Sequence, residues 1–442
     1  MNTTIPETLV PLSGFPTVPR IPAHIQSLSE CAQFEVNKLM ENPLLDEDAL
    51  DDGFLLCDLN VVYQKLVAWR HLFPRVKPFY ALKCHPDENV ARVLADSGGA
   101  GFDCASVAEM ELALTAQSDP CSVVYANPQR AENHLVQALQ LGTKALTFDG
   151  VEELNKIDWA CRQANVGDRP TMILRILVPD GDSIVPLGEK FGAPLEGVDR
   201  LVARAMELDL PIKGVSFHSG SGNHSPKAYE TAIHLAAQAI ERINELQPGN
   251  LCQLLDLGGG YPGRDGYLSE SERFAGTKSP ERANGCTAGT TSEIAATVSP
   301  LLDRLFPKEV QIISEPGRYF VEGAFALCSP IYRVEEEDGV RHYFIPQGVE
   351  GVFKDCILCN EVFVPEPLVP DRQLEVELYP SCVHGPSGRD VDIICRDHPM
   401  PKLLEGDWLV FDRMGAYTMS IAARHGRPPV RYVIGGSHPS IV

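Results

Sequence analysis

The fold of this chain can be traced outward from one stretch, Pro78-Phe79-Tyr80-Ala81-Leu82-Lys83-Cys84-His85. An aromatic and aliphatic run of strand character ends there in a lysine, and a helix-like segment at residues 86–90 follows almost at once. A lysine ammonium is costly to hold at the end of a buried strand, because the loss of hydration disfavours its charged form. The stretch therefore predicts either a Schiff-base lysine, which reacts with a carbonyl group, or a surface lysine whose aliphatic stem packs along the protein.

A repeating pattern extends from this stretch through the next two hundred or so residues. Short apolar runs that end in polar or glycine residues alternate with amphipathic segments of helical length. The runs expected to form strands are 79–83, 101–103, 123–127, 145–149, 172–176, 212–218, 253–257 and 310–315. Eight strand–helix units over about 250 residues are typical of a (β/α)8 barrel of the TIM type. An open, doubly wound sheet is the alternative.

The chain divides into three predicted parts. Residues 1–50 are rich in proline and acidic residues and are expected to form a lead-in segment. The barrel is expected over residues 51–318, with a long polar loop at 263–292. Short alternating runs, among them 319–327 and 408–411, predict an all-β domain over residues 319–442, joined by the N-terminal strand at 54–59. The predicted fold class is α/β, a barrel followed by a C-terminal all-β domain.

Composition excludes several classes of partner. Of the 442 residues, 44% are hydrophobic and 22% are charged, as in a soluble globular protein. The net charge of −22 argues against nucleic acid or an anionic membrane as a partner, since both require a basic surface. The N-terminus resembles no secretory signal. The Cys356–Cys359 pair lacks companion ligands, so we expect no bound metal. The thirteen cysteines form no disulfide pattern, so we expect the protein to reside in the reducing cytoplasm.

The barrel prediction places functional groups at the C-terminal ends of the strands. Those ends carry Lys83, Asp103, Asn127, Arg175, His218, Gly258, Gly259, Gly260 and Glu315. The glycine run would let backbone N–H groups approach an anion, although a plain turn explains it equally well. Arg318 is a second anion-binding candidate, close to the end of the last strand.

Two further strand ends fit a flat heterocyclic ring. Glu315 could keep a pyridine nitrogen protonated and so make the ring an electron sink, or it could simply form an ion pair with Arg318. His218 could stack on such a ring, or it could be a packed polar residue. A reactive lysine, two anion-binding loops, a carboxylate and a stacking histidine together match the needs of pyridoxal 5'-phosphate (PLP).

Several motifs resemble the eukaryotic ornithine decarboxylase family, within the barrel-type PLP enzymes that include alanine racemase. They are Phe79-Tyr80-Ala81-Leu82-Lys83-Cys84, Gly101-Phe102-Asp103-Cys104-Ala105-Ser106, Tyr125-Ala126-Asn127-Pro128, Lys190-Phe191-Gly192-Ala193, Gly214-Val215-Ser216-Phe217-His218, Leu255-Asp256-Leu257-Gly258-Gly259-Gly260, Glu315-Pro316-Gly317-Arg318-Tyr319 and Met414-Gly415-Ala416-Tyr417-Thr418. The resemblance covers roughly residues 50 to 435.

The resemblance implies a role for each matching residue. Lys83 binds the cofactor as a Schiff base, His218 stacks on its ring and Glu315 pairs with the ring nitrogen. Asp103, Glu109 and Arg175 support the ring and the lysine. The implied phosphate-binding set is Ser221, Gly258, Gly259, Gly260, Arg318 and Tyr417, with Gly317 also among the cofactor-binding residues. The resemblance further implies a homodimer with active sites at the interface, into which a loop near residue 388 enters from the partner.

The sequence departs from the family in the substrate-binding half. The family's Tyr-Asp pair, whose aspartate binds the distal ammonium of ornithine, is replaced by Cys359-Asn360. In the partner loop Gly388, after Ser387, replaces the cysteine that steers proton return, and Arg389 replaces a second aspartate. A like-charge contact at about 4 Å costs on the order of 4 kcal/mol at an effective dielectric constant of about 20. Glu350 and Glu361 lie nearby in sequence and could restore an acidic pocket.

These departures predict a PLP-dependent α-amino-acid decarboxylase whose substrate has a neutral or carboxylate-bearing distal end, with Asn360, Arg389 and Cys359 as candidate substrate-binding residues. Gly388 and Ser387 occupy the catalytic loop. Without the cysteine, Lys83, His218 or water are alternative proton donors. The rival functions are a decarboxylating transaminase or oxidative deaminase that yields an aldehyde, a racemase, and a non-catalytic regulator of the antizyme-inhibitor type.

Overall fold

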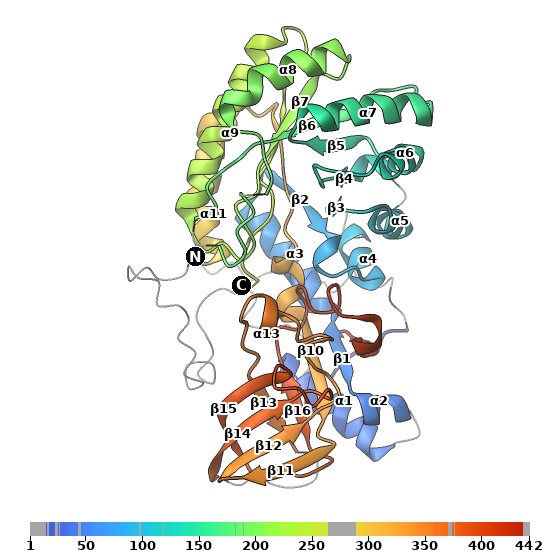
Figure 1. Cartoon of the computed structure of the whole chain (residues 1–442), viewed down its shortest axis with the longest axis vertical. Coiled ribbons are helices and arrows are strands. Elements are labelled where there is room, and N and C mark those ends of the chain that lie inside the picture. Colours follow the sequence, from blue (N-terminus) through green and yellow to red (C-terminus); the bar gives the residue numbers. More distant parts are fainter. Residues whose placement is uncertain are drawn as a thin grey trace.

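The computed structural model describes residues 15, 17–22, 25, 27–42, 46–96, 99–117, 119–181, 183–188, 190–263, 289–369, 374 and 376–435. Two bodies are stacked along the long axis of the molecule, a barrel ringed by helices and a β-rich body beneath it (Figure 1). No helix among the described residues is both long enough and apolar enough to span a bilayer.

The first body is a closed barrel of eight strands, β2 to β9, each paired in parallel with its neighbours. The strands are β2 (Val76–Ala81), β3 (Gly101–Cys104), β4 (Val123–Tyr125), β5 (Ala145–Phe148), β6 (Thr171–Arg175), β7 (Ile212–Ser216), β8 (Leu254–Asp256) and β9 (Gln311–Ser314). Closure is explicit, because β2 pairs with β9 through Val76 opposite Ile312. The predicted barrel is therefore confirmed, and the doubly wound alternative is wrong.

Helices cover the outside of the barrel. They are α3 (Leu59–Leu72), α4 (Glu88–Asp96), α5 (Val107–Ala116), α6 (Glu132–Gln140), α7 (Val151–Ala164), α8 (Val198–Glu207), α9 (Pro226–Leu246) and α11 (Thr291–Leu305). Side-chain caps fix where some of them begin: Ser106 accepts from the N–H of Glu109 at the start of α5. Thr290 and Glu293 form a capping box at the start of α11.

The second body contains two sheets. The five-stranded sheet has the order β13 (Pro365–Leu368), β16 (Trp408–Phe411), β10 (Phe325–Pro330), β1 (Phe54–Asp58) and β17 (Val430–Val433). The four-stranded sheet has the order β11 (Arg333–Glu337), β12 (Val340–Phe344), β14 (Leu378–His384) and β15 (Ile393–Pro401). The predicted all-β domain is thus confirmed as a fold class. Strand β1 lies in this body although its residues fall within the span predicted for the barrel.

Other local expectations also differ from the structure. The strand expected at 319–327 begins only at Phe325, because helix α12 (Arg318–Val321) and a 3-10 turn precede it. The lead-in segment contains α1 (Leu28–Glu41) and α2 (Glu47–Asp52), and α1 packs on the five-stranded sheet through Cys31, Val36 and Leu39. The long loop expected at 263–292 ends before α11, which starts at Thr291. Residues 264–288 of that loop lie outside the described residues, and the domain boundaries themselves stay predictions.

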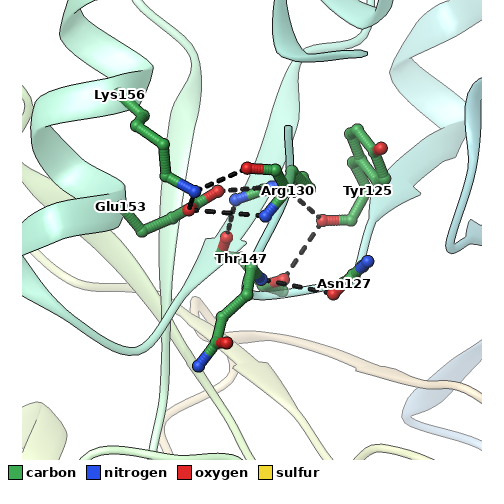
Figure 2. Close-up of polar contacts among 7 residues, drawn as sticks. Tyr125, Asn127, Arg130, Thr147, Glu153 and Lys156 are labelled. Carbon is green, nitrogen blue, oxygen red and sulfur yellow. Dashed lines mark hydrogen bonds and ion pairs between the residues drawn. The ribbon is translucent and has the colours of Figure 1, made fainter. Parts of the chain in front are cut away.

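A buried arginine forms hydrogen bonds to three elements of the barrel, β4, β5 and α7 (Figure 2). Arg130, in the loop after β4, donates from Nε to Oε1 of Glu153 on α7 at 2.8 Å and from a terminal nitrogen to the Tyr125 carbonyl at 3.2 Å. It also donates to the carbonyl of Thr147 on β5. Lys156 pairs with the same glutamate. The arginine and glutamate side chains are 0% and 3% exposed, so neither charge is compensated by water.

We expect removal of this carboxylate to destabilise the barrel strongly. Glu153→Ala leaves the Arg130 guanidinium buried without its counter-charge, at a cost of about 3–5 kcal/mol. Glu152→Ala is the matched control, because Glu152 is the exposed neighbour on the same helix. Urea unfolding followed by fluorescence measures both variants. Equal midpoints for the two variants would contradict the role assigned to the pair.

Candidate active site

Lys83 and Asp103 form an ion pair at the C-terminal mouth of the barrel. Lys83 lies in a 3-10 turn (Leu82–Cys84) just after β2, and not at the last residue of the strand as expected. Ala81 lies opposite Asp103 in the β2–β3 register, so Nζ reaches Oδ2 of the aspartate. The aspartate is fully buried, whereas 35% of the lysine side chain is exposed. Burial opposes the ammonium charge, but the Asp103 and Glu315 carboxylates outweigh it and raise the pKa of Lys83.

Two buried carboxyl groups, Glu315 and Asp256, lie at the ends of β9 and β8. The N–H of Glu315 donates to the Gly258 carbonyl at 2.7 Å, which ties the two strand ends together. Burial, with Asp256 and Asp103 adding to it, raises the pKa of Glu315 well above its usual range. Burial also raises the pKa of Asp256, to about 6. A cation placed against this pair would therefore be strongly stabilised, because it would offset the repulsion between two desolvated acids.

His218 and Arg175 lie at the ends of the neighbouring strands β7 and β6 of the same mouth. The N–H of Gly220 donates to His218 Nδ1 at 3.1 Å. Burial, together with the charges of Arg175 and Lys83, lowers the pKa of His218 well below its ordinary value, so the imidazole is neutral at pH 7. With Nδ1 accepting, Nε2 carries the proton. Arg175 ends β6, and its guanidinium lies 5.0 Å from the ring of Phe191.

Residues 258–260, called here the glycine loop, lie too close to neighbouring backbone for any side chain at 258 or 260. Gly258 has φ +62°, and a Cβ there would lie 2.0 Å from the carbonyl oxygen of Phe217. Gly260 has φ +103°, and its Cβ would lie 2.2 Å from the Gly220 carbonyl oxygen. The carbonyls of Gly258, Gly259 and Gly260 accept hydrogen bonds from Glu315, Tyr229 and Asn223. Neither Gly259 nor Gly260 donates its N–H to another described residue, so both can serve an anion.

Arg318 follows the end of β9, which contacts the glycine loop through Glu315, and Tyr417 lies beside Arg318. Arg318 starts α12, lies 5.4 Å from the Tyr417 ring and pairs with Glu322 at 3.2 Å. The N–H of Tyr417 donates to the carbonyl of Cys84 at 3.0 Å, which joins the segment that contains Tyr417 to the turn at Lys83. Gly317 packs against the same turn, since a Cβ there would meet the Cys84 Cβ at 2.8 Å. Ser221 pairs through its backbone with Val185, from the loop after β6.

Unpaired buried atoms indicate that a polar ligand completes this site. Within the described residues, Nε of Arg318 and Oδ1 of Asp103 are buried without a hydrogen-bond partner. Buried polar atoms are nearly always paired in native structures. A cationic donor beside a glycine loop fits a phosphate, and buried acids opposite a lysine fit a protonated heterocycle with a carbonyl group. The residues therefore fit PLP. Asp256 was not singled out from the sequence, although its place at a strand end was a usable signal.

The candidate substrate residues lie in two separate segments, one after helix α13 (Asp355–Leu358) and one in loop 385–392. Cys359 and Asn360 follow this short helix, and the charge of Arg318 acts on both Asp355 and Cys359. This segment therefore borders the anion-binding side of the mouth. Asn360 has a positive φ of +52°.

Ser387, Gly388 and Arg389 lie in loop 385–392, between β14 and β15. Arg389 forms an ion pair with Glu350, and both side chains are more than half exposed. Ser387 accepts from the N–H of Arg389 at 3.4 Å. Among the described residues, no hydrogen bond or ion pair joins this loop to Lys83, His218 or Glu315 of its own chain. The structure thus brings the candidate cofactor residues together, and this loop makes no hydrogen bond or ion pair with those three of them within the described part of the chain.

Comparisons with known proteins agree with this geometry. The model of the pyridoxal binding domain of pyridoxal-dependent decarboxylases matches residues 59–322. Antizyme inhibitor 2 of Xenopus laevis is 36% identical over 87% of this chain and 81% of its own length. Ornithine decarboxylase of Schizosaccharomyces pombe is 33% identical over 90% and 86%.

Solved structures give the same result. The arginine decarboxylase of Paramecium bursaria Chlorella virus, bound to agmatine, is 29% identical, covers 90% of this chain and 100% of its own, and gives a TM-score of 0.77. The lysine/ornithine decarboxylase of Vibrio vulnificus, complexed with cadaverine, is 26% identical over 93% and 99%, with a TM-score of 0.74. The chain therefore belongs to the pyridoxal-dependent decarboxylase family, carboxy-lyases that resemble ornithine decarboxylase and use PLP as their cofactor.

Proposed function

We propose that this protein decarboxylates an α-amino acid whose distal end is neutral or carries a carboxylate. The observation that carries the proposal is that two glutamates near the substrate-binding segments, Glu350 and Glu361, each have an arginine partner. Glu350 pairs with Arg389, and Glu361 lies 3.6 Å from Arg413. Neither glutamate is therefore left as an unmatched acceptor for a distal ammonium group. With Asn360 in place of the family's aspartate, no residue at these positions selects a cationic side chain.

Each cofactor residue has a proposed task. Bound PLP supplies an electron sink for the pair released when CO2 leaves. Lys83 would hold the cofactor through its amine, and Asp103 orients that amine through the ion pair. Glu315 would support a protonated ring nitrogen as its counter-charge, and such a cation would oppose the effect of burial, which raises the pKa of Glu315 in its absence. His218, neutral and buried, provides a flat surface for stacking. Arg175 adds positive charge on the side opposite Lys83.

The phosphate-binding residues form the second half of the proposal. Arg318 supplies charge, Gly258 to Gly260 supply N–H groups, and Tyr417, Ser221 and Gly317 shape the surrounding loops. Substrate binding is assigned to Cys359, Asn360 and Arg389. Because no hydrogen bond or ion pair within the described residues joins loop 385–392 to Lys83, His218 or Glu315, we assign the loop to the active site of a second subunit, so that the functional unit is a homodimer.

The loop positions 387 and 388 provide no strong acid that could serve as the proton donor. Gly388 offers no side chain, has φ +66° and has no atom within 4 Å of the position of a Cβ. Ser387 is a weak acid and already accepts from Arg389. We therefore assign protonation to Lys83, His218 or water. A proton delivered to the wrong carbon, followed by hydrolysis of the imine, would yield an aldehyde by decarboxylating transamination. Oxidation of the carbanion by an external oxidant such as O2, again followed by hydrolysis, would yield an aldehyde by oxidative deamination. These are the nearest alternative reactions.

A regulatory function is the second candidate, favoured by the 36% identity to an antizyme inhibitor. A protein that only binds a partner has no need of an assembled lysine, paired acids and anion loop, so the geometry argues for catalysis. The two functions separate on whether the purified protein retains PLP. We also propose a cytoplasmic location, because all twelve cysteines among the described residues are free thiols.

Arg318 provides a test of the phosphate assignment. We expect Arg318→Ala to weaken PLP binding about 10- to 100-fold, since it removes a charge-assisted hydrogen bond. Binding of pyridoxal, which lacks the phosphate, should stay within about 3-fold. Fluorescence titration of cofactor-free protein with both compounds measures the difference. A loss of the same size for pyridoxal would show that Arg318 serves the fold and not the phosphate.

An amino-acid panel tests the substrate assignment, with amine and aldehyde products quantified separately. We expect kcat/KM for the best neutral or carboxylate-bearing substrate to exceed that for ornithine and lysine by at least about 10-fold. This is less than the full like-charge cost, because Arg389 is exposed and already paired. Asn360→Asp with Arg389→Asp should raise relative turnover of ornithine, whereas Asp390→Asn on the same loop should not. Ornithine as the best substrate of the unmodified protein would refute the proposal.

A further inference from the structure

Three metal-ligating side chains meet on the four-stranded sheet of the second domain. His342 lies on β12 and directly opposite Cys382 in the parallel β12–β14 register. His384 lies two residues beyond Cys382 on β14, so its side chain points to the same face of the sheet. The His342 Nδ1 and His384 Nε2 atoms are 2.9 Å apart, and the ligand atoms of all three residues lie within 4.8 Å of one another.

The face that carries this cluster is open enough for an ion to enter. His342 and His384 are half-buried, while Cys382 is buried beneath them at 8% exposure. Phe344, opposite His384 in the register, stacks on that imidazole with ring centroids 4.8 Å apart and so limits its rotation. The antiparallel β11–β12 register places Glu335 opposite His342, which adds a carboxylate on this side of the sheet.

We propose that His342, Cys382 and His384 form a binding site for a divalent transition-metal ion, with Zn²⁺ as the preferred ion. Two imidazoles and one thiolate are ligands that Zn²⁺ favours, and three protein ligands leave a fourth position for water. This site is separate from the PLP site and involves neither Cys356 nor Cys359.

The present spacing requires only a small adjustment to hold an ion. Tetrahedral coordination with Zn–N distances near 2.0–2.1 Å separates two ligand nitrogens by about 3.4 Å. The imidazole nitrogens, now 2.9 Å apart, would have to move apart by a few tenths of an ångström, and the thiol would have to approach. Side-chain rotation about Cβ supplies such a shift without moving the strands. The thiol loses its proton on binding, because the thiolate is the ligand form.

The position of the cluster gives the ion a structural consequence. Loop 385–392 starts at the residue after His384 and closes where the N–H of Gly385 donates to the Asp392 carbonyl at 2.9 Å. An ion that joins β12 to the end of β14 would fix the origin of this loop. This consequence rests on the proposed function, in which the loop carries Gly388 and Arg389 into the active site of the partner.

Titration of the PLP-loaded protein, with its cysteines kept as free thiols, with Co²⁺ tests the site. We expect one equivalent to give the ligand-field absorption of tetrahedral Co²⁺, at longer wavelengths than the cofactor absorbs, and Zn²⁺ to displace it. Cys382→Ser and His342→Gln should each weaken binding by more than about 100-fold, because loss of even an outer partner of a metal ligand costs 10- to 100-fold. Cys121→Ser and His134→Gln, exposed on the barrel, should leave binding unchanged.

Equal Co²⁺ affinity in Cys382→Ser and the unmodified protein would overturn the site, and so would the absence of a stoichiometric tetrahedral spectrum. Amide hydrogen exchange tests the proposed effect on loop 385–392 independently of metal binding itself. Zn²⁺ should slow exchange of amides in residues 385–392 of the unmodified protein and not of His342→Gln. Binding without such protection would keep the site and remove its link to the loop. Neither readout depends on which amino acid the protein decarboxylates.

Discussion

The ion pair between Lys83 and Asp103 is the interaction on which the rest of the site depends. Lys83 is held at the mouth of the barrel because β2 and β3 are adjacent and their register brings Asp103 within reach. The aspartate is fully buried, so the pair maintains a charge that burial alone would disfavour. The acids Glu315 and Asp256, the neutral His218 and the glycine loop then surround this amine from the ends of β7, β8 and β9. Barrel closure is what brings strand ends that are far apart in sequence into one pocket.

Charge pairing differs between the part of the site proposed to bind the cofactor, called here the cofactor half, and the part proposed to bind the substrate, called here the substrate half. In the cofactor half, buried acids and bases remain incompletely paired, as shown by Arg318 Nε and Asp103 Oδ1. In the substrate half, the acids Glu350 and Glu361 already have arginine partners. A site that leaves charges unmatched is prepared for an ionic ligand, whereas one that matches them internally gives no advantage to a cationic side chain.

Sequence reasoning predicted the elements well and the contacts between them poorly, for physical reasons. Each barrel strand is a short apolar run bounded by polar residues, so local composition was sufficient to find it. The turn at Lys83 was missed because it continues an apolar run that suits a strand, and the helix at Arg318 was missed because its residues Tyr319, Phe320 and Val321 also suit a strand. The Arg130–Glu153 pair spans 23 residues and depends on how α7 docks. The His342–Cys382 pairing depends on the register of two strands forty residues apart, which no local pattern specifies.

The measurement that tests the account most directly is reduction of the purified protein with sodium borohydride, followed by peptide mass spectrometry. A Schiff base between Lys83 and PLP is fixed by reduction and survives digestion. The account predicts one stable pyridoxyl adduct, on the peptide that contains Lys83, and its loss in Lys83→Ala. Modification of a different lysine, or of none in protein that still binds PLP, would contradict it.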